Sequence, residues 1–344
     1  MWPKRRLSAS PEPRAYLRRG PSLKATAKAY AIQGLIKYHG LRNPRLRVPY
    51  HDSISVCMKS LPTITTVEAD GKLPRDAVRI NGAAPTRLEL SRVEAVLSKL
   101  RQVARKRTAR FRVSSRNPHV NGKGLGFSAA GFAALGLAAS AALGLSLPPK
   151  ELSQIVRLGA GSAARSLTGG FSIWYANRDG RSYSEQLAPA RSIPLRTVIV
   201  PVPSEVKTDR AHEDSVKSPL YRARLKKIDG QLAKMKRAIR KGDVGIIGRL
   251  AEEDTLSLHA VTMTGPRGMV LFSPLSITII NEVRRLREEE DLPAWFSLDT
   301  GPSVFVNTTP DAVSKVRRTV GKLTDQVLTS DPGGSAELLD KHLF

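Results

Sequence analysis

A glycine-rich loop that runs directly into an alanine-rich helix is the sequence feature that most constrains the fold of this chain. The stretch Asn117–Leu143 reads N-P-H-V-N-G-K-G-L-G-F-S-A-A-G-F-A-A-L-G-L-A-A-S-A-A-L, with Gly122, Gly124 and Gly126 at alternate positions. Alternate glycines permit tight turns that expose backbone N–H groups, and the first turn of a helix adds unpaired donors and the positive end of its dipole. The loop and the helix from Ser128 therefore predict an anion site, with phosphate as the expected ligand.

The chain of 344 residues carries a large excess of positive charge, because 56 Lys and Arg face 30 Asp and Glu, for a formal net charge of +26. Its length is sufficient to bury a full core, and its 41% hydrophobic and 25% charged residues are typical of a folded soluble protein. Nucleic acid, an acidic membrane surface and a multiply phosphorylated metabolite all fit such a charge. A solvated basic surface without a specific partner is the alternative.

Cysteine content and hydropathy bear on the cellular compartment. The single cysteine, Cys57, lies in the run S-I-S-V-C-M, which excludes a disulfide framework and a cysteine metal cluster. The six histidines show no paired ligand spacing, so no metal site is expected. No uninterrupted apolar run reaches the roughly 18 to 20 residues that span a bilayer. Residues 1–22 are rich in Pro, Ser and Arg, and we expect a disordered basic arm there rather than a secretion signal. These features predict a cytoplasmic protein without a membrane partner.

The order of predicted elements indicates an α+β chain in two lobes, with the boundary between residues 190 and 205. Apolar periodicity of two or of three to four residues distinguishes strands from helices. In the first half it predicts strands at 25–32, 53–58, 63–69, 111–115, 171–175 and 197–203, and helices at 87–107, from 128 onward and around 153–158. In the second half it predicts helices at 221–241, 243–259, 274–290 and 310–328, and a strand-turn-strand unit at 295–307.

Four segments concentrate residues that handle phosphate and carboxylate groups. Lys37 follows an apolar strand near a glycine turn, from which a lysine can project into a cleft. The second segment is the glycine loop, and the third, R-L-G-A-G-S-A-A-R, presents Ser162 and Arg165 in a small-residue turn. In the fourth, S-L-D-T-G-P, Asp299 follows an apolar strand and can act as a base or cap the turn. Taken singly, each of these residues is better explained by an ordinary surface or structural role.

Together, the segments resemble the diphosphomevalonate decarboxylase family of the GHMP kinase superfamily, from about Ala25 to Val316. Six ordered matches that include a lysine, an arginine and an aspartate are specific, whereas a lone G-x-G-x-G would be weak. The matching motifs are K-Y-x-G at 37–40, S-I-S-V at 53–56, S-A-A-G-F-A-A-L at 128–135, G-S-A-A-R-S-L with G-G-F at 161–171, S-L-H-A at 257–260 and D-x-G-P at 299–302.

The resemblance implies a two-lobed GHMP-kinase-like fold. We expect an N-terminal ribosomal-protein-S5-like lobe at 23–200, a C-terminal ferredoxin-like α/β lobe at 201–330 and a tail at 331–344. In this family, ATP phosphorylates the tertiary 3-hydroxyl of a phosphorylated mevalonate, and loss of that phosphate drives decarboxylation to an isopentenyl product. The expected partner is therefore a small phosphorylated metabolite. Dimers are common in the family, so the resemblance allows a homodimer, but the sequence itself does not define the oligomeric state.

The resemblance also assigns roles to residues of this chain. The reacting centre would consist of Asp299, Lys37 and Arg165. Arg165 would hold the substrate carboxylate, Lys37 would neutralise charge on the departing phosphate, and Asp299 would orient Lys37 or take the hydroxyl proton. The substrate-binding residues would be Tyr38, Ser162 and Arg165. The phosphate loop would consist of Gly122, Lys123, Gly124, Gly126 and Ser128.

The sequence departs from the family's pattern at groups that grip phosphate or substrate. The family's loop P-T-A-A-G-L-A-S-S aligns with V-N-G-K-G-L-G-F-S, so Phe127 replaces a serine and Lys123 enters the loop. Four further departures are Ala160 for a serine, Leu41 for a lysine, His39 for a tryptophan and Ile32 for an asparagine. The departures fall on binding positions, whereas the Lys, Arg and Asp of the reacting centre remain. This distribution predicts altered use of substrate or nucleotide.

The preferred hypothesis is an ATP-independent decarboxylase that converts mevalonate 3,5-bisphosphate to isopentenyl phosphate, CO2 and phosphate without a cofactor. Its substrate already carries the leaving phosphate. The alternative is a decarboxylase of mevalonate 5-diphosphate or 5-phosphate that requires ATP and Mg2+, since Asp299 is needed as a base only where a hydroxyl is to be phosphorylated. A nucleic-acid-binding protein is the distant alternative, and the aromatic fraction of 5% without a recognisable RNA-binding motif disfavours it.

Overall fold

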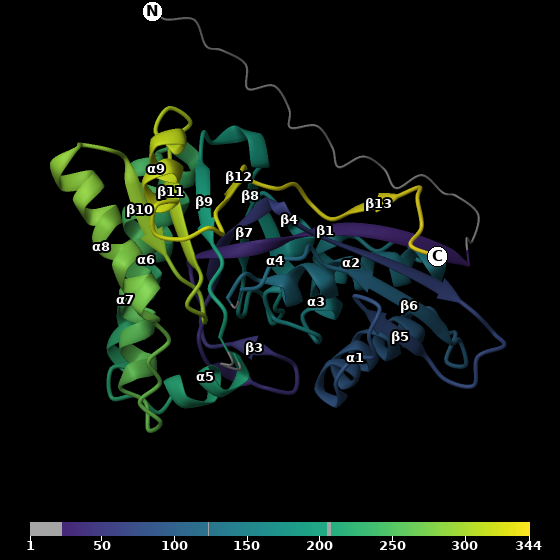
Figure 1. Ribbon diagram of the computed structural model, residues 1–344. Helices are drawn as coiled ribbons and strands as arrows, with labels where there is room; N and C mark the ends of the chain where they lie inside the picture. The colour runs from purple at the N-terminus through teal and green to yellow at the C-terminus, as the bar shows by residue number, and fades with distance from the viewer. Residues whose placement is uncertain (1–22, 123, 205–207) are drawn as a thin grey trace, which may run out of the picture.

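The computed structural model describes residues 23–122, 124–204 and 208–344, in which two β-sheets define two lobes (Figure 1). Within these residues the first sheet has the strand order β13-β1-β4-β6-β5, with β7 beside β4 and β8 beside β7. The second sheet has the order β10-β11-β9-β12. Helices pack on both sheets, so the α+β class predicted from the sequence is confirmed. Lys123 and the arm expected at 1–22 lie outside the described residues.

The first sheet is built around two long antiparallel strands, β1 and β4. Its strands are β1 (Lys24–Ile36), β4 (Ser53–Ala69), β5 (Ala77–Ile80), β6 (Phe111–Arg116), β7 (Phe171–Trp174), β8 (Ser184–Ala188) and β13 (Glu337–Leu339), and a small hairpin pairs β2 (Leu41–Asn43) with β3 (Val48–Pro49). β4 is continuous, so the separate strands expected at 53–58 and 63–69 are wrong. Pro62 is accommodated opposite Tyr30, beside a register shift between Tyr30 and Ile32 at which β4 carries the extra residues, and such irregularities are where sheets tolerate proline.

Four helices of the first lobe are α1 (Arg87–Val103), α2 (Phe127–Ala142), α3 (Pro149–Val156) and α4 (Ala163–Thr168), and they gather below β1 and β4 in Figure 1. Most residues of α2 are buried, because its Ala and Gly side chains are small enough to let the helix pack closely on β1 and β4. α1 ends at Val103 rather than at the expected 107. Arg105 adopts a left-handed backbone with φ of 56°, which a continuing helix cannot contain.

The second lobe packs helices against its four-stranded sheet. Its strands are β9 (Arg196–Val200), β10 (Ala294–Ser297), β11 (Val304–Thr308) and β12 (Leu328–Ser330). Its helices are α5 (Thr208–Ser215), α6 (Tyr221–Lys241), α7 (Val244–Met263), α8 (Pro274–Glu289) and α9 (Val313–Val320), and the short 3-10 turn η1 (Ala190–Ser192) precedes β9. α9 is shorter than the helix expected over 310–328, because the chain leaves it at Gly321 and residues 328–330 pair with β9 as β12. No described helix is long and apolar enough to cross a membrane.

Strand pairing differs from the expected lobe bounds at two places. β9 lies within the expected first lobe at 23–200 but pairs with β11 and β12 of the second sheet. The expected tail at 331–344 returns to the first lobe, where β13 pairs with β1 (Figure 1). Apolar periodicity reports that one face of a short strand is buried, and it carries no information about which sheet the strand joins.

Candidate active site

The end of strand β1 and the turn after β10 meet at Gly34. Both carboxylate oxygens of Asp299 accept the N–H of Gly34, at 3.1 and 3.2 Å. A Cβ atom on Gly34 would lie 2.6 Å from Cγ of Lys37 and 2.9 Å from Oδ1 of Asp299. Only glycine at position 34 therefore leaves room for both side chains. The structure brings together Lys37 and Asp299, which lie far apart in the sequence.

Arg165 contributes a buried cation from α4. Its relative exposure is 2%, and its Nε and Nη1 atoms have no hydrogen-bond partner among the described residues. The guanidinium carbon lies 5.6 Å from the ring centre of Tyr38. Ser166, the next residue in α4, donates a hydrogen bond of 2.6 Å to the carbonyl of Tyr30 and so fixes the helix on β1. Because an unpaired buried guanidinium is costly, Arg165 is suited to receive an anionic ligand.

Tyr38 and Ser162 are half-buried and lie beside this centre. The Tyr38 ring is stacked on His212 at 5.0 Å and meets the edge of Trp174 at 4.9 Å. Its hydroxyl lies 2.8 Å from the position that a Cβ atom on Gly161 would take, so Tyr38 reaches the turn that precedes Ser162. The expected substrate-binding residues Tyr38, Ser162 and Arg165 thus come from neighbouring segments.

The glycine loop is pressed between β1 and the D-T-G-P turn. Gly124 and Gly126 have positive φ values of 81° and 77°. A Cβ atom on Gly124 would lie 2.8 Å from the backbone N of Gly301, and one on Gly126 would lie 2.7 Å from the carbonyl O of Ile32. This close approach places the start of α2 beside the Asp299 turn, and Gly126 provides no side-chain cap for the helix.

The outer residues of the loop behave differently from the glycines. Ser128 is exposed, whereas Phe127 is half-buried and packs against the core of the first lobe. Phe127 therefore has a packing role at the position where the family pattern has a serine. Residues 118–121, which precede Gly122 in the sequence, help to line a surface hollow of about 680 Å³. It is lined by Asn81, Pro118, His119, Val120, Asn121, Pro201, Asp325, Gln326, Val327 and Leu328.

Burial shifts the protonation of the central groups. Desolvation raises the pKa of Asp299 to about 6, although the positive charge of Lys37 acts in the opposite direction. Burial lowers the pKa of Lys37, while the negative charges of Asp254 and Asp299 raise it. Burial also lowers the pKa of Arg165. A carboxylate whose pKa is close to neutrality can exchange a proton with a substrate at physiological pH.

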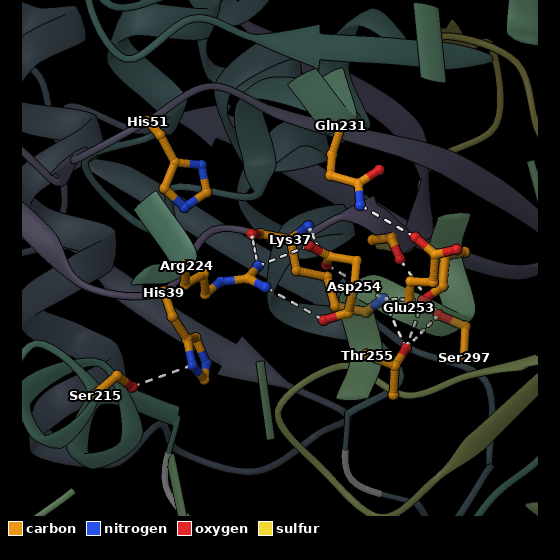
Figure 2. Close-up of polar contacts among 12 residues, drawn as sticks. Lys37, His39, His51, Ser215, Arg224, Gln231, Glu253, Asp254, Thr255 and Ser297 are labelled. Atoms are coloured by element: carbon orange, nitrogen blue, oxygen red, sulfur yellow. Dashed lines mark hydrogen bonds and ion pairs between the residues drawn. The ribbon is translucent and has the colours of Figure 1, made fainter. Parts of the chain in front are cut away.

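Two further residues, Asp254 and Thr255 of α7, hold the Lys37 amine and were missed by sequence reasoning (Figure 2). Nζ of Lys37 donates to Oγ1 of Thr255 at 3.0 Å and to the carbonyl of Ala251 at 3.3 Å, and it lies 3.7 Å from Oδ2 of Asp254. The available signal was the E-E-D-T run, which lies one residue before the S-L-H-A motif. Helical spacing places Ala251, Asp254 and Thr255 on one face of α7.

His39, which the sequence marks only as a departure from the family pattern, links two of the predicted segments. Its Nε2 and the hydroxyl of Thr300 lie 3.1 Å apart, and its Nδ1 lies 3.2 Å from the hydroxyl of Ser215. Burial lowers the pKa of His39 well below its usual value, so the ring is neutral. Among the described residues, no group of three or more His, Cys, Asp and Glu side chains could hold a metal ion.

Comparison with known proteins covers both lobes. Residues 29–185 match the diphosphomevalonate decarboxylase-like N-terminal domain, and residues 205–332 match the mevalonate 5-diphosphate decarboxylase C-terminal domain. A phosphomevalonate decarboxylase from Haloferax volcanii is 41% identical over 320 residues, which span 93% of this chain and 98% of the relative. A diphosphomevalonate decarboxylase from Homo sapiens is 30% identical over 322 residues, which span 86% and 79%.

Solved structures show the same architecture. Mevalonate diphosphate decarboxylase from Staphylococcus aureus superposes with a TM-score of 0.86 at 27% identity, over 92% of this chain and 98% of that structure. The enzyme from Enterococcus faecalis gives 0.85 at 29% identity, over 92% and 99%. The two-lobed GHMP-kinase-like fold expected from the resemblance is thereby confirmed. The chain belongs to the diphosphomevalonate decarboxylase family and is a carboxy-lyase.

Proposed function

We propose that this chain decarboxylates mevalonate 5-phosphate in a reaction that consumes ATP. The observation that carries the proposal is the Asp299 carboxylate, which is held beside Lys37 with a pKa of about 6. A base at this position is required when a substrate hydroxyl must lose its proton, and a substrate that already bears a 3-phosphate has no such hydroxyl. The relative from Haloferax volcanii is named a phosphomevalonate decarboxylase, which agrees with this choice.

Each residue of the centre has a role that its geometry supports. Arg165 binds the substrate carboxylate through its unpartnered N–H groups. Asp299 accepts the proton of the 3-hydroxyl, and Lys37 stabilises negative charge on the oxygen that leaves with phosphate. ATP supplies the phosphoryl group that makes this oxygen a leaving group. The bond between the carboxylate and C2 then breaks, its electron pair forms the double bond between C2 and C3, and CO2 and phosphate depart.

The surface beside the centre fits a nucleotide. The backbone of Gly122, Gly124 and Gly126 leads into the N-terminus of α2, an arrangement that favours phosphate. The adjoining hollow of about 680 Å³ is within the size range of small-molecule sites. A similar solved structure, with a TM-score of 0.85 at 28% identity over 92% of this chain and 99% of that structure, contains MVAPP, AMPPCP and magnesium. We assign the nucleotide phosphates to the loop and place the remainder of the nucleotide in the hollow.

The choice of a monophosphate rests on the residues around Tyr38. Leu41 stands where the family pattern has a lysine, and the buried Ala160 stands where it has a serine. Both substitutions remove a group that could contact a second phosphate. The chain therefore has fewer donors for a diphosphate, which is consistent with a substrate that carries one phosphate at C5.

The ATP-independent decarboxylation of mevalonate 3,5-bisphosphate is a second candidate. It is favoured by Phe127, whose side chain packs on the core at a loop position where the family pattern has a serine. An altered loop is expected where no nucleotide needs to be gripped. The base at Asp299 has no evident task in that reaction, and for this reason we place it second.

Release of CO2 from purified protein distinguishes these candidates. The substrates are mevalonate 5-phosphate, mevalonate 5-diphosphate and mevalonate 3,5-bisphosphate, each supplied with and without ATP and Mg2+. We expect rapid release from the 5-phosphate only when ATP and Mg2+ are present. Release from the 3,5-bisphosphate without ATP, at a rate that ATP does not increase, would instead establish the second candidate.

A further inference from the structure

The peptide unit of Lys37 is held by two side chains from another part of the chain. Lys37 directly follows Ile36, the last residue of β1, where the strand ladder can no longer pair its backbone. Its N–H donates to Oδ2 of Asp254 at 2.8 Å, and its carbonyl accepts a hydrogen bond from Nη2 of Arg224 at 2.8 Å. Both backbone groups of Lys37 are thus satisfied by charged side chains of the second lobe (Figure 2).

Arg224 and Asp254 also bind each other. Nη2 of Arg224 lies 2.8 Å from Oδ1 of Asp254, and each side chain is only 2% exposed. Arg224 comes from α6 and Asp254 from α7, so the pair joins two helices of the second lobe to the end of β1 in the first. A buried ion pair offers little net stability over apolar packing, because desolvating both charges offsets their attraction. Net stability therefore does not account for this buried pair, whereas its contacts with Lys37 point to a functional role.

The pair also determines where the Lys37 amine lies. Asp254 uses Oδ2 for the Lys37 N–H, and the same oxygen lies 3.7 Å from Nζ of Lys37. A single carboxylate thereby fixes both ends of the lysine. The Arg224 guanidinium, bonded to the other oxygen, holds that carboxylate in place. Removing Arg224 frees Asp254 to rotate, and removing Asp254 leaves the Lys37 N–H without its acceptor.

We propose that Arg224 and Asp254 are positioning residues that fix Lys37 in the reacting centre, a role that rests on the proposed function of Lys37. Neither residue needs to touch the substrate. A displacement of about 1 Å in a group that acts on the transition state can lower turnover about 100-fold. The expected consequence is a loss in kcat at little change in KM, because Arg165, Tyr38 and Ser162 hold the substrate.

The charges that face Lys37 predict opposite pH effects for the two residues. Asp254 from α7 and Asp299 from the turn after β10 raise the pKa of Lys37, whereas Arg224 from α6 lowers it. His259 of α7 lies nearby, but burial lowers its pKa to about 3, so it is neutral at the pH of the assay. Lys37 acts as a cation, and activity falls at alkaline pH as it loses its proton. Asp254→Asn should move this alkaline limb to lower pH, and Arg224→Met should move it to higher pH.

The experiment measures kcat and KM for Asp254→Asn, Arg224→Met and Arg224→Lys between pH 6 and 10.5. For Asp254→Asn we expect kcat to fall about 100-fold and the alkaline limb to move down by about one pH unit, as is typical when an opposite charge within about 4 Å is removed. Arg224→Met should show a similar fall in kcat and an upward shift. Arg224→Lys retains the charge without the paired N–H geometry, and we expect an intermediate kcat with an unmoved limb.

A matched control is available on the same helix. Glu252 of α7 forms a partly buried pair with Arg287 of α8, at 3.1 Å, and neither side chain is bonded to Lys37. Glu252→Gln and Arg287→Met should lower thermal stability to a smaller degree, because this pair is more exposed, and should leave the pH profile unchanged. Unshifted profiles in both Asp254→Asn and Arg224→Met, with kcat losses no larger than in these controls, would overturn the proposal. Lys37→Met separates this outcome from a failure of the proposed function, because full activity in that variant would remove Lys37 itself from the centre.

Discussion

The N–H of Gly34 donates to both carboxylate oxygens of Asp299, at 3.1 and 3.2 Å, across a separation of 265 residues. The absent side chain of Gly34 is as important as its N–H, since Cγ of Lys37 and Oδ1 of Asp299 occupy the space where a Cβ atom would lie. A glycine inside strand β1 thus sets the separation between the base and the cation of the proposed centre. Glycine weakens the interior of a strand. Its presence there often marks a place where another part of the chain approaches the backbone closely, as Asp299 does here.

Gly34→Ala should inactivate the enzyme without unfolding it. The added methyl group must displace the Lys37 chain or the Asp299 carboxylate, and we expect kcat to fall about 100-fold. Gly131→Ala in α2 is the matched control, because a Cβ atom there meets nothing within 4 Å. It should raise stability by about 0.5–1 kcal/mol with kcat unchanged. Wild-type turnover in Gly34→Ala would show that the separation of Lys37 and Asp299 is not critical.

Sequence reasoning identified residues that the fold brings together, but it could not identify what holds them. Lys37, Arg165 and Asp299 carry motif signals because their chemistry restricts the residue types around them. Arg224 carries none, since an arginine in a helix with many Lys and Arg residues is indistinguishable from a solvated one until the structure shows it buried. Only the three-dimensional pairing of α6, α7 and β1 distinguishes this arginine from its neighbours.

The same limit applies to the fold. Periodicity found the helices α6, α7 and α8 with nearly correct bounds, because long amphipathic helices repeat their signal over many turns. It divided β4 into two strands at Pro62, since the sequence does not show that β4 continues past the proline with extra residues opposite β1. The return of residues 331–344 to the first sheet was missed for a similar reason, as β13 has only three residues.

Asp299→Asn should abolish decarboxylation and stabilise the folded protein. Burial raises the pKa of Asp299 to about 6, above the usual 3.8, so the folded state prefers the neutral carboxyl. As pH rises from 3.8 to about 6, the unfolded chain ionises Asp299 more readily than the folded one, which lowers the free energy of unfolding by up to about 3 kcal/mol. At higher pH this cost is constant. The asparagine removes it.

Denaturant unfolding of wild type and Asp299→Asn at pH 4 and pH 7.5 measures this effect. The stability gain should be about 1 to 3 kcal/mol at pH 7.5 and should shrink towards pH 4, because below its pKa the Asp299 carboxyl is neutral in the folded state and its burial no longer costs free energy. In wild type, kcat/KM should rise with pH through about 6 as Asp299 ionises. A gain that is independent of pH would contradict the assigned pKa.

Arg165→Met should weaken substrate binding and stabilise the unliganded protein. Two guanidinium nitrogens of Arg165 are buried without partners, and the apolar methionine removes that cost, which we expect to be about 1–3 kcal/mol. KM for the substrate should rise at least about 100-fold, since a charge-paired carboxylate contact is lost. Thermal unfolding with and without mevalonate 5-phosphate tests both effects. Without substrate, the variant should unfold at a higher midpoint temperature than wild type, and the substrate should raise that midpoint by less. Arg165→Lys is the control that retains the charge, and it should recover part of the rise in unfolding midpoint that the substrate causes.

Leu41→Lys should shift substrate preference from mevalonate 5-phosphate towards mevalonate 5-diphosphate. Leu41 is half-buried three residues beyond Tyr38, and the family pattern has a lysine there. A cation at this position adds an attraction for the second phosphate, and we expect the ratio of kcat/KM values to change about 10-fold, equivalent to about 1.4 kcal/mol. Leu41→Met, which has similar length without the charge, should leave the ratio unchanged. An equal rise in kcat/KM for both substrates would mean that the lysine attracts both anions without contacting the second phosphate. The monophosphate preference would then have to arise from other residues.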